Sequence, residues 1–335
     1  MRKLLLNGLL LCGLFTGNRL FSQVDPHFSQ FYMFPTYLNP ALTGAFDGNV
    51  RLTGIYRNQW SNISTPFSTI GLSGDFNTNK SMNFGAGVLN QTGGDGGYSY
   101  TTAHGSAAFT GLRWGTNGTQ HLVIGLNAGI VNRSFDRSKM TFGDQWNPIT
   151  GYNPGNTSQD VLKQTSSTVF DAGVGVLYYD GRRGKKANVY LGASANHLTQ
   201  PTDPFSGKEG AKLPIRYSFH GGVRIAISDN FSLTPNALYM VQSGASETML
   251  GLYSQFRISA ASDLMLGVNY RHEDAVAPFL GITFNGLVIG CSYDTNISDL
   301  GKMANGTNAF EFSVSFIGKR KVKTNVDGNF VCPRL

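Results

Sequence analysis

The sequence predicts an all-β protein, a transmembrane antiparallel β-barrel of about 14 strands with an aromatic N-terminal segment packed in or across its lumen. Three observations favour this fold class. Apolar residues alternate with small or polar ones over segments of about 10 residues, the length a tilted strand needs to cross a bilayer. The 335 residues include 42 Gly, 23 Phe and 14 Tyr but only 14% charged residues, which suits membrane strands better than helices. A secretory signal precedes this pattern, and no later apolar stretch is long enough for a spanning helix.

Residues 1–22 are expected to be a secretory signal peptide. Two basic residues follow Met1, an apolar run extends from Leu4 to Phe15, and Ser22 supplies the small residue before the cleavage site. The mature chain would then begin at Gln23. A membrane anchor is the first alternative, but the run is too short to span a bilayer. A lipoprotein signal at Cys12 is the second, and the bulky residue before that cysteine disfavours it.

Residues 23–48 are predicted to form a separate N-terminal segment. It holds three prolines and many aromatic residues, which argues against a regular strand. A short helical turn over Phe28–Met33 is open to it. Because so aromatic a segment would not stay in water, we expect it to act as a plug, inside the barrel or across one mouth.

Residues 49–318 are predicted to be the outer-membrane barrel. Around residue 125, Leu122, Ile124 and Leu126 are apolar, whereas Gly125 and Asn127 are small or polar. Since a strand places successive side chains on opposite faces, each strand has one apolar face, which would look toward lipid in a barrel and toward a core in a soluble sandwich. An even number of strands leaves no edge unpaired in a closed barrel. The predicted strands lie near 49–59, 65–76, 82–91, 98–113, 120–133, 168–180, 187–197, 215–227, 231–241, 246–258, 263–272, 276–285, 287–294 and 308–318.

The connections between these strands are of two kinds. Turns such as 77–81 and 285–286 are short, whereas residues 134–167 and 198–214 form long loops. Outer-membrane barrels show this asymmetry, with the long loops outside the cell, and loops carry function more often than strands do. Residues 319–335 form a C-terminal tail that includes Cys332, for which the sequence suggests no role.

No catalytic, cofactor-binding or metal-ligating residue is predicted, and an enzyme is not expected. The six His residues are far apart in the sequence, without metal-ligand spacing. The glycine-rich stretch 93–97 lacks the Lys-Ser/Thr ending of a phosphate loop, and the chain contains no Gly-x-Ser-x-Gly. The net charge of +7 is concentrated only at 182–186 and 319–323, which we interpret as a solvated turn and tail. Nucleic acid is not an expected partner of an exported chain.

Three stretches near the N-terminus carry a resemblance to a known family. They read Asp25-Pro26-His27-Phe28-Ser29-Gln30-Phe31-Tyr32, Asn39-Pro40-Ala41-Leu42-Thr43-Gly44 and Tyr56-Arg57-Asn58-Gln59-Trp60. Their order and spacing resemble the opening signature of the PorP/SprF family, outer-membrane proteins of the type IX secretion and gliding machinery of Bacteroidetes. The likeness continues through 292–294 and 310–312 and covers nearly the whole mature chain.

The resemblance implies a non-catalytic, integral protein of the cell outer membrane. Such a protein binds, helps to secrete or anchors a cargo, such as a gliding adhesin, through the cargo's type IX C-terminal signal domain. For some members the family also implies a link to the secretion motor through a periplasmic peptidoglycan-binding lipoprotein. We interpret the motif residues as lumen packing, with direct cargo contact as the alternative. These residues are Asp25, Pro26, Phe28, Ser29, Gln30, Tyr32, Asn39, Pro40, Gly44, Tyr56, Arg57, Gln59 and Trp60. For Arg57, Gln59 and Trp60, near a strand end, an interfacial anchor is equally open.

The leading hypothesis is an interaction protein that receives or anchors cargo through its long loops. Exposed aromatic residues dominate many protein interfaces, so Trp146, Tyr152 and Phe205 are the candidate cargo contacts. One alternative is a porin-like channel, for which a lumen lined by Gly, Ser, Asn and Arg would be suitable. A barrel associated with the secretion motor and a soluble periplasmic β-protein are further alternatives. No cofactor is expected, and outer-membrane lipid would surround the barrel.

Overall fold

The computed structural model describes residues 25–61, 65–94, 96–115, 118–156, 158–159, 164–182, 184–202, 205, 211–299, 301 and 308–318. The signal peptide expected at residues 1–22 and the tail expected at 319–335, with Cys332, lie outside the described residues.

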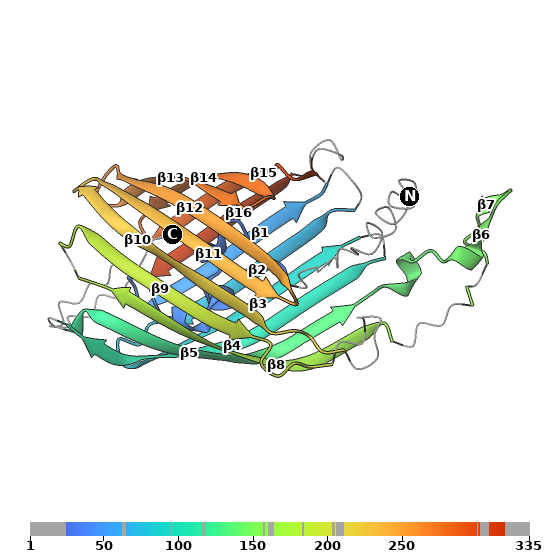
Figure 1. Cartoon of the computed structure of the whole chain (residues 1–335), viewed down its shortest axis with the longest axis horizontal. Helices are drawn as coiled ribbons and strands as arrows, with labels where there is room; N and C mark the ends of the chain where they lie inside the picture. The colour runs from blue at the N-terminus through green and yellow to red at the C-terminus, as the bar shows by residue number, and fades with distance from the viewer. Residues whose placement is uncertain are drawn as a thin grey trace, which may run out of the picture.

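Fourteen strands close into one antiparallel barrel (Figure 1). Around the ring the order is β1, β16, β15, β14, β13, β12, β11, β10, β9, β8, β5, β4, β3 and β2, with β1 paired to β16. The predicted antiparallel barrel of about 14 strands is therefore confirmed, and every predicted strand matches an observed one to within two residues at each end. The ring strands are β1 Val50–Gln59, β2 Phe67–Phe76, β3 Met82–Gly93, β4 Tyr98–Trp114, β5 Gln120–Ser134, β8 Ser166–Asp180, β9 Ala187–Asn196, β10 Arg216–Ser228, β11 Phe231–Gln242, β12 Ala245–Arg257, β13 Ser262–Arg271, β14 Ala275–Phe284, β15 Leu287–Asn296 and β16 Ala309–Gly318.

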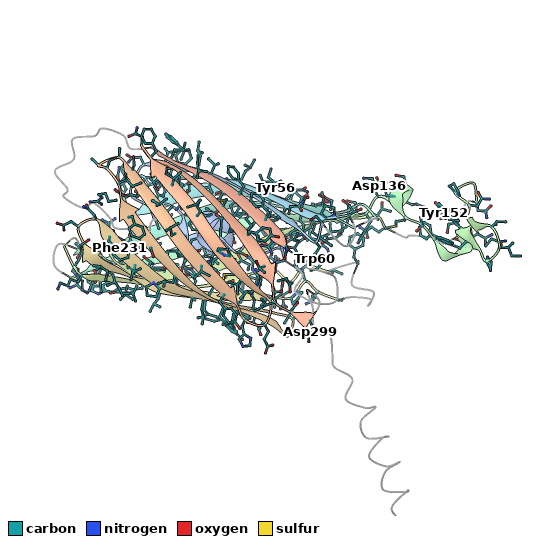
Figure 2. The ribbon with its side chains drawn as sticks, turned by 90° about the horizontal axis from the view of Figure 1, so that it is seen from above. Tyr56, Trp60, Asp136, Tyr152, Phe231 and Asp299 are labelled. Carbon is teal, nitrogen blue, oxygen red and sulfur yellow. The ribbon has the colours of Figure 1, made fainter. Side chains whose placement is uncertain are left out.

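The long connection between β5 and β8 contains structure that the sequence did not reveal. It holds two 3₁₀ turns, η4 Arg137–Lys139 and η5 Gly143–Gln145, and a hairpin of β6 Trp146–Asn147 and β7 Gly151–Tyr152. Strands of two residues are too short to show an alternating pattern. In both views the hairpin extends past the rim of the barrel (Figures 1 and 2).

The two ends of the barrel differ. β1 begins and β16 ends at the same end, where Val50 pairs with Gly318. The connections there, such as 77–81 and 285–286, are short, and we refer to this end as the turn end. The long connections after β5 and β9 both leave from the opposite end, the loop end. This is the predicted asymmetry, and in outer-membrane barrels the end with long loops lies outside the cell.

The outer wall of the barrel is apolar. On β5, Ile124 and Leu126 are 41% and 59% exposed, while Val123, which precedes them, is fully buried. The prediction that the apolar rows face outward is therefore confirmed. No helix among the described residues is long and apolar enough to cross a membrane. Exposed aromatic side chains gather in two bands, as in outer-membrane barrels: Tyr56, Tyr217, Tyr239, Tyr270, Tyr293 and Phe310 toward the loop end, and Phe76, Phe84, Phe109, Trp114, Phe256, Phe284 and Phe316 toward the turn end.

The buried core lies within the ring and is shared between the strands and the N-terminal segment. That segment contains the 3₁₀ turn η1 Phe31–Met33, the single helical turn α2 Pro35–Leu38 and the 3₁₀ turn η2 Pro40–Leu42. A proline at the first position starts each of the last two turns, where its missing N–H costs nothing. Both hydrophobic clusters of the molecule combine residues of this segment with residues of the strands.

Candidate functional site

The N-terminal segment, residues 25–46, runs along the buried face of the strands from the loop end to the turn end. Only His27 and Tyr37 in it are half-buried, and all its other residues are buried. At the loop end the Asp25 amide donates to Gln242 at the end of β11 (3.3 Å). Near the turn end the Gly44 amide donates to Asp75 of β2 (2.7 Å). The segment therefore has an anchor near each mouth.

The first anchor is the Asp25 network, formed by Asp25, His197, Asp171 and Arg216. His197 contacts two carboxylates, Asp25 through Nε2 (2.7 Å) and Asp171 through Nδ1 (2.8 Å). Arg216 of β10 lies 2.9 Å from the same Asp25 oxygen, and the Tyr100 hydroxyl donates to the other (3.1 Å). Two cations face two carboxylates, so the buried charges compensate one another.

This pairing decides which groups of the network are charged. Burial alone would lower the pKa of His197, but the carboxylates of Asp25 and Asp171 outweigh burial and raise its pKa to about 9. Burial would raise the pKa of Asp25, but His197 and Arg216 hold it well below its usual range. At neutral pH His197 is therefore a cation beside the ionised carboxylate of Asp25.

The second anchor is the Glu311 network, centred on Glu311 of β16. Its two carboxylate oxygens accept the backbone N–H groups of Ser29 (2.7 Å) and Gln30 (2.8 Å). Arg57 of β1 pairs with Glu311 and, at 3.0 Å, with Asp294 of β15. The Ser29 hydroxyl donates to Asp294 (2.6 Å). The segment thus supplies donors to carboxylates that would otherwise be buried with too few partners.

A second guanidinium completes this network. Arg271 of β13 lies 3.0 Å from Asp294 and also pairs with Asp274 at the loop end. Its Nη1 donates to the Ser29 hydroxyl (3.1 Å). Strands β1, β13, β15 and β16 therefore all meet the segment at one point.

The third anchor is Asn39, between α2 and η2. Its side-chain oxygen accepts the Ala41 amide (2.9 Å) and so caps η2. Its Nδ2 donates to the carbonyl oxygens of Val176 in β8 (3.0 Å) and Ala193 in β9 (3.3 Å), and it lies 3.1 Å from Nε2 of His220 in β10.

Glycines on the facing strands make room for this turn. A Cβ at Gly125 of β5 would lie 2.2 Å from the backbone nitrogen of Ala41, and one at Gly175 of β8 would lie 1.9 Å from Oδ1 of Asn39. Distances of this size are far below van der Waals contact, so the strands approach the segment closely only because these positions lack a side chain.

The anchor near the turn end involves Gly44. Asp75 accepts its amide and also pairs with Arg51 of β1 (2.8 Å). The same guanidinium donates to the Leu42 carbonyl oxygen (3.1 Å). Gly44 adopts φ +73°, and a Cβ there would collide with Asn83, so both backbone and space require glycine.

The remaining motif residues of the segment have packing roles. The Pro26 carbonyl accepts the Tyr37 hydroxyl (3.0 Å), and the Phe28 ring packs edge-on against Phe34 at 6.0 Å between centroids. Tyr32 lies edge-on to His220 at 5.7 Å. Pro40 is the first residue of η2.

The motif at the end of β1 is divided between the two faces of the wall. Arg57 points inward, and its Nε donates to Gln59 (2.9 Å). Tyr56 was expected to pack in the lumen, and this was wrong: it lies on the outer wall and is 39% exposed, because neighbours along a strand face opposite ways. Trp60 follows the strand with φ +63° and packs edge-on against Phe67. Figure 2 shows Tyr56 and Trp60 at different places along the wall.

The three candidate cargo contacts do not form one surface. Trp146 and Tyr152 pair across the β6–β7 hairpin with ring centroids 5.8 Å apart. Phe205 instead packs against Phe135 (5.2 Å) and under the Arg133 guanidinium (5.7 Å) at the base of the loops. Phe205 therefore holds two loops together.

Sequence reasoning missed most of the strand residues that hold the segment. His197, Asp171, Arg216 and Arg271 carried no signal as single residues. The one available signal was a charged residue among apolar alternation, as at Glu311 between Phe310 and Phe312. Among the described residues, no three or more His, Cys, Asp or Glu side chains gather closely enough to hold a metal ion. The charged groups described above bond to one another and to the segment.

Comparison with known proteins gives a family and a fold. A family model described as "Type IX secretion system membrane protein PorP/SprF" matches residues 20–316. No curated protein sequence matches the chain. The crystal structure of the Ralstonia pickettii toluene transporter TbuX is similar, with a TM-score of 0.51 and 10% identity over 84% of this chain and 93% of that one. The monoaromatic hydrocarbon channel CymD has a TM-score of 0.49 and 12% identity over 87% and 94%. At these identities the likeness concerns the barrel fold alone.

Proposed function

The chain belongs to the PorP/SprF family of type IX secretion system membrane proteins, and on that premise we propose that it is a non-catalytic barrel that receives a secreted cargo protein and holds it at the cell surface. As a closed barrel of this family it is an outer-membrane component of the type IX secretion system. The proposed step is that it recognises the cargo, such as an adhesin, through the cargo's type IX C-terminal signal domain.

The observation that carries this proposal is the anchored N-terminal segment. We propose that residues 23–48 act as a plug, supported by the burial of residues 25–46 and by anchors near both mouths. A lumen filled by this proposed plug would leave the loop-end surface as the place to meet a partner. The rival function, an open porin-like channel, is less well supported because it would need the Asp25 and Glu311 networks to be broken. TbuX is a toluene transporter, but its 10% identity carries no function to this chain.

The hairpin of β6 and β7 is the proposed cargo contact. Trp146 is 60% exposed, and Ile149 at the tip is 92% exposed. With Tyr152 they form an apolar patch, and such patches mark interaction sites. The hairpin projects beyond the rim in two views at right angles (Figures 1 and 2), which favours a protein partner over lipid. Phe205 lies outside this patch, since it packs against Phe135 within the loops.

A double substitution in the chromosomal gene tests this contact. Trp146→Ala with Tyr152→Ala should leave the barrel at normal abundance but leave one adhesin unsecreted or shed into the medium. The matched control is Ile258→Ala, which removes an exposed apolar side chain at the turn end. Surface labelling and immunoblots of cells and medium measure the result. Unchanged display of every type IX cargo in a deletion strain would overturn the proposed function.

Two further measurements separate the alternatives. Purified protein in planar bilayers should conduct little, whereas a large steady current would favour the channel. We also propose a periplasmic peptidoglycan-binding lipoprotein as a partner at the turn end, on the support of the family alone. Pull-down from detergent-solubilised membranes, followed by mass spectrometry, tests both this partner and the cargo.

A further inference from the structure

One strand of the ring, β8, has no strand partner along part of one edge among the described residues. β8 pairs with β5 over its whole length, from Ser166 opposite Ser134 to Asp180 opposite Gln120. On its other side it pairs with β9 only from Val174 to Tyr179. The first eight residues of β8 therefore have a strand on one side alone, the longest such stretch among the described ring strands. Figure 1 shows β8 reaching past the end of β9.

The edge has no partner strand because the chain turns away from β8 where β9 ends. His197 follows β9 with φ +61°, a left-handed conformation that turns the chain away from its neighbour. The next residues cap part of the edge: the Leu198 amide donates to the Ala172 carbonyl oxygen (2.9 Å), and the Thr199 hydroxyl donates to that of Phe170 (3.1 Å). Beyond Phe170 toward the loop end, no described strand pairs with the edge. Pro201, Thr202, Phe205 and Leu213 of the connection after β9 lie near Ser167 and Val169, with which they line a small cavity.

The geometry shows which backbone groups are available. The carbonyl groups of Phe170 and Ala172 face the open side, whereas that of Ser167 faces β5, where the Asn132 side chain donates to it (3.2 Å). Because backbone groups alternate in direction along a strand, the N–H and C=O of Ser166 and Thr168 also face the open side. The Ser166 carbonyl oxygen accepts the Gln164 side-chain amide (2.7 Å), so the Ser166 N–H and both backbone groups of Thr168 are the ones offered to a partner. Both residues are exposed.

The free edge lies on the water side of the apolar wall. The outward face changes from apolar to polar at Thr168, whose hydroxyl accepts from Asn132 of β5 (2.7 Å). On β3 and β4, Asn90 and Thr101 form an equivalent pair (2.8 Å) in the same row of the sheet. Phe170, 60% exposed, is the last large apolar residue of β8 before this change. A protein partner rather than lipid can therefore reach Ser166 and Thr168.

We propose that an extended strand of the secreted cargo's C-terminal domain adds to this edge of β8. The inference rests on the proposed function and assigns the cargo a docking site. Unpaired backbone N–H and C=O groups in a row are satisfied by an extended chain, the mode known as β-augmentation. The edge residues Ser166, Thr168 and Phe170 are uncharged, so backbone pairing supplies the affinity for the added strand. The Phe170 ring also offers it an apolar contact. Closed barrels otherwise leave no such edge.

A proline substitution tests the site in the full-length protein. Thr168→Pro removes an N–H that faces the open edge and breaks no bond to β5, a position at which strands tolerate proline. The control Thr168→Val keeps the N–H and removes the hydroxyl. The probe is the purified C-terminal domain of each type IX adhesin encoded by the same genome, titrated against the protein in lipid nanodiscs. We expect Thr168→Pro to weaken binding by about tenfold or more, and Thr168→Val by less than about threefold.

The outcomes separate this inference from the proposed function. If the wild-type protein binds a cargo domain and Thr168→Pro binds it equally well, the edge is not the site although the function stands. If no cargo domain binds the wild-type protein, both are overturned. Self-association that Thr168→Pro abolishes would make a second copy the occupant and refute the cargo site.

A second measurement covers a proline variant that fails to assemble. Phe170 is replaced in cells by benzoylphenylalanine, a photoreactive analogue, and the same is done at Phe284, an exposed residue near the turn end. Adducts from position 170 that map to one extended segment of a cargo C-terminal domain support the site. Cargo adducts that are absent, or equally abundant from both positions, overturn it.

Discussion

Replacing Glu311 with Gln should loosen the loop-end half of the N-terminal segment without unfolding the barrel. Glu311 is fully buried, and its carboxylate accepts the amides of Ser29 and Gln30 and pairs with Arg57. Gln has nearly the same shape but only one acceptor oxygen. Its amide group would turn a donor toward a donor, so at least one buried hydrogen bond must be lost.

The magnitude follows from these contacts. A hydrogen bond to a charged group contributes about 1.5–3 kcal/mol, and breaking a buried ion pair completely costs about 3–5 kcal/mol. Arg57 keeps Asp294 at 3.0 Å, so the loss should lie near the lower limit, at about 3 kcal/mol. That free energy corresponds to an increase of about 100-fold in the population with this half of the segment detached.

Limited proteolysis of the purified barrel measures that population. The segment holds cleavable aromatic residues from Phe28 to Tyr37, whereas paired membrane strands resist proteases. When detachment and return are fast relative to cleavage, the cleavage rate follows the detached population. The matched control is Glu247→Gln, because Glu247 is a buried carboxylate at the same mouth that lies 3.5 Å from His27. Burial lowers the pKa of His27 well below its usual value, so this carboxylate has no cationic partner there to lose. Its effect should be below about fivefold, since at most one hydrogen bond between neutral groups is weakened.

The reasoning would be refuted by either of two results. Cleavage of Glu311→Gln at the wild-type rate would mean that the carboxylate does not hold the segment. An equal acceleration by Glu247→Gln would mean that any lost charge at this mouth has the same effect, whatever its hydrogen bonds.

Three further predictions concern the pH response, the close packing and the orientation. The pKa of His197 is raised from 6.5 to about 9. The stabilisation from its charge is therefore complete below about pH 6.5 and is lost as pH rises through about 9. Protease cleavage at the start of the segment should increase from pH 7 to 10 in the wild type but not in His197→Gln. Gly125→Ala would place a Cβ 2.2 Å from the segment's backbone, whereas a Cβ at Gly105 would have nothing within 4 Å. In thermal unfolding, the free energy of unfolding should fall by more than about 2 kcal/mol for Gly125→Ala and change little for Gly105→Ala. Trp146→Cys should react with an impermeant maleimide on intact cells, and Ile258→Cys only after permeabilisation. The reverse result would mean that the turn end, and not the loop end, faces the outside of the cell.

The barrel could be predicted from the sequence because its signal is local. Alternation along ten residues depends only on which way each side chain points, as at Ile124 and Leu126 on β5. The turn and loop lengths then indicate the two ends. Tyr56 was misassigned for a related reason: it was grouped with Arg57 as one motif, although adjacent residues of a strand cannot share a face.

The anchors could not be predicted because they join residues far apart in the chain. Ser29 and Glu311 are 282 positions apart, and Asp25 and His197 are 172 apart. Which inward residues meet depends on the register of every strand between them and on closure of the ring. The motif residues Asp25, Ser29 and Gln30 could be recognised as a group, but their partners on the strands could not.

His197 illustrates how such a non-local pairing can determine local structure. A non-glycine residue at φ +61° is disfavoured by roughly 1–2 kcal/mol, and although the sequence predicts that the strand ends at 197, no glycine marks this left-handed position. The two carboxylates that hold its ring come from the N-terminal segment and from β8. Each charge-assisted hydrogen bond contributes about 1.5–3 kcal/mol, so the two together exceed the backbone cost. The bend that ends β9 and leaves the edge of β8 free is therefore imposed by Asp25 and Asp171 rather than by the residues that bend.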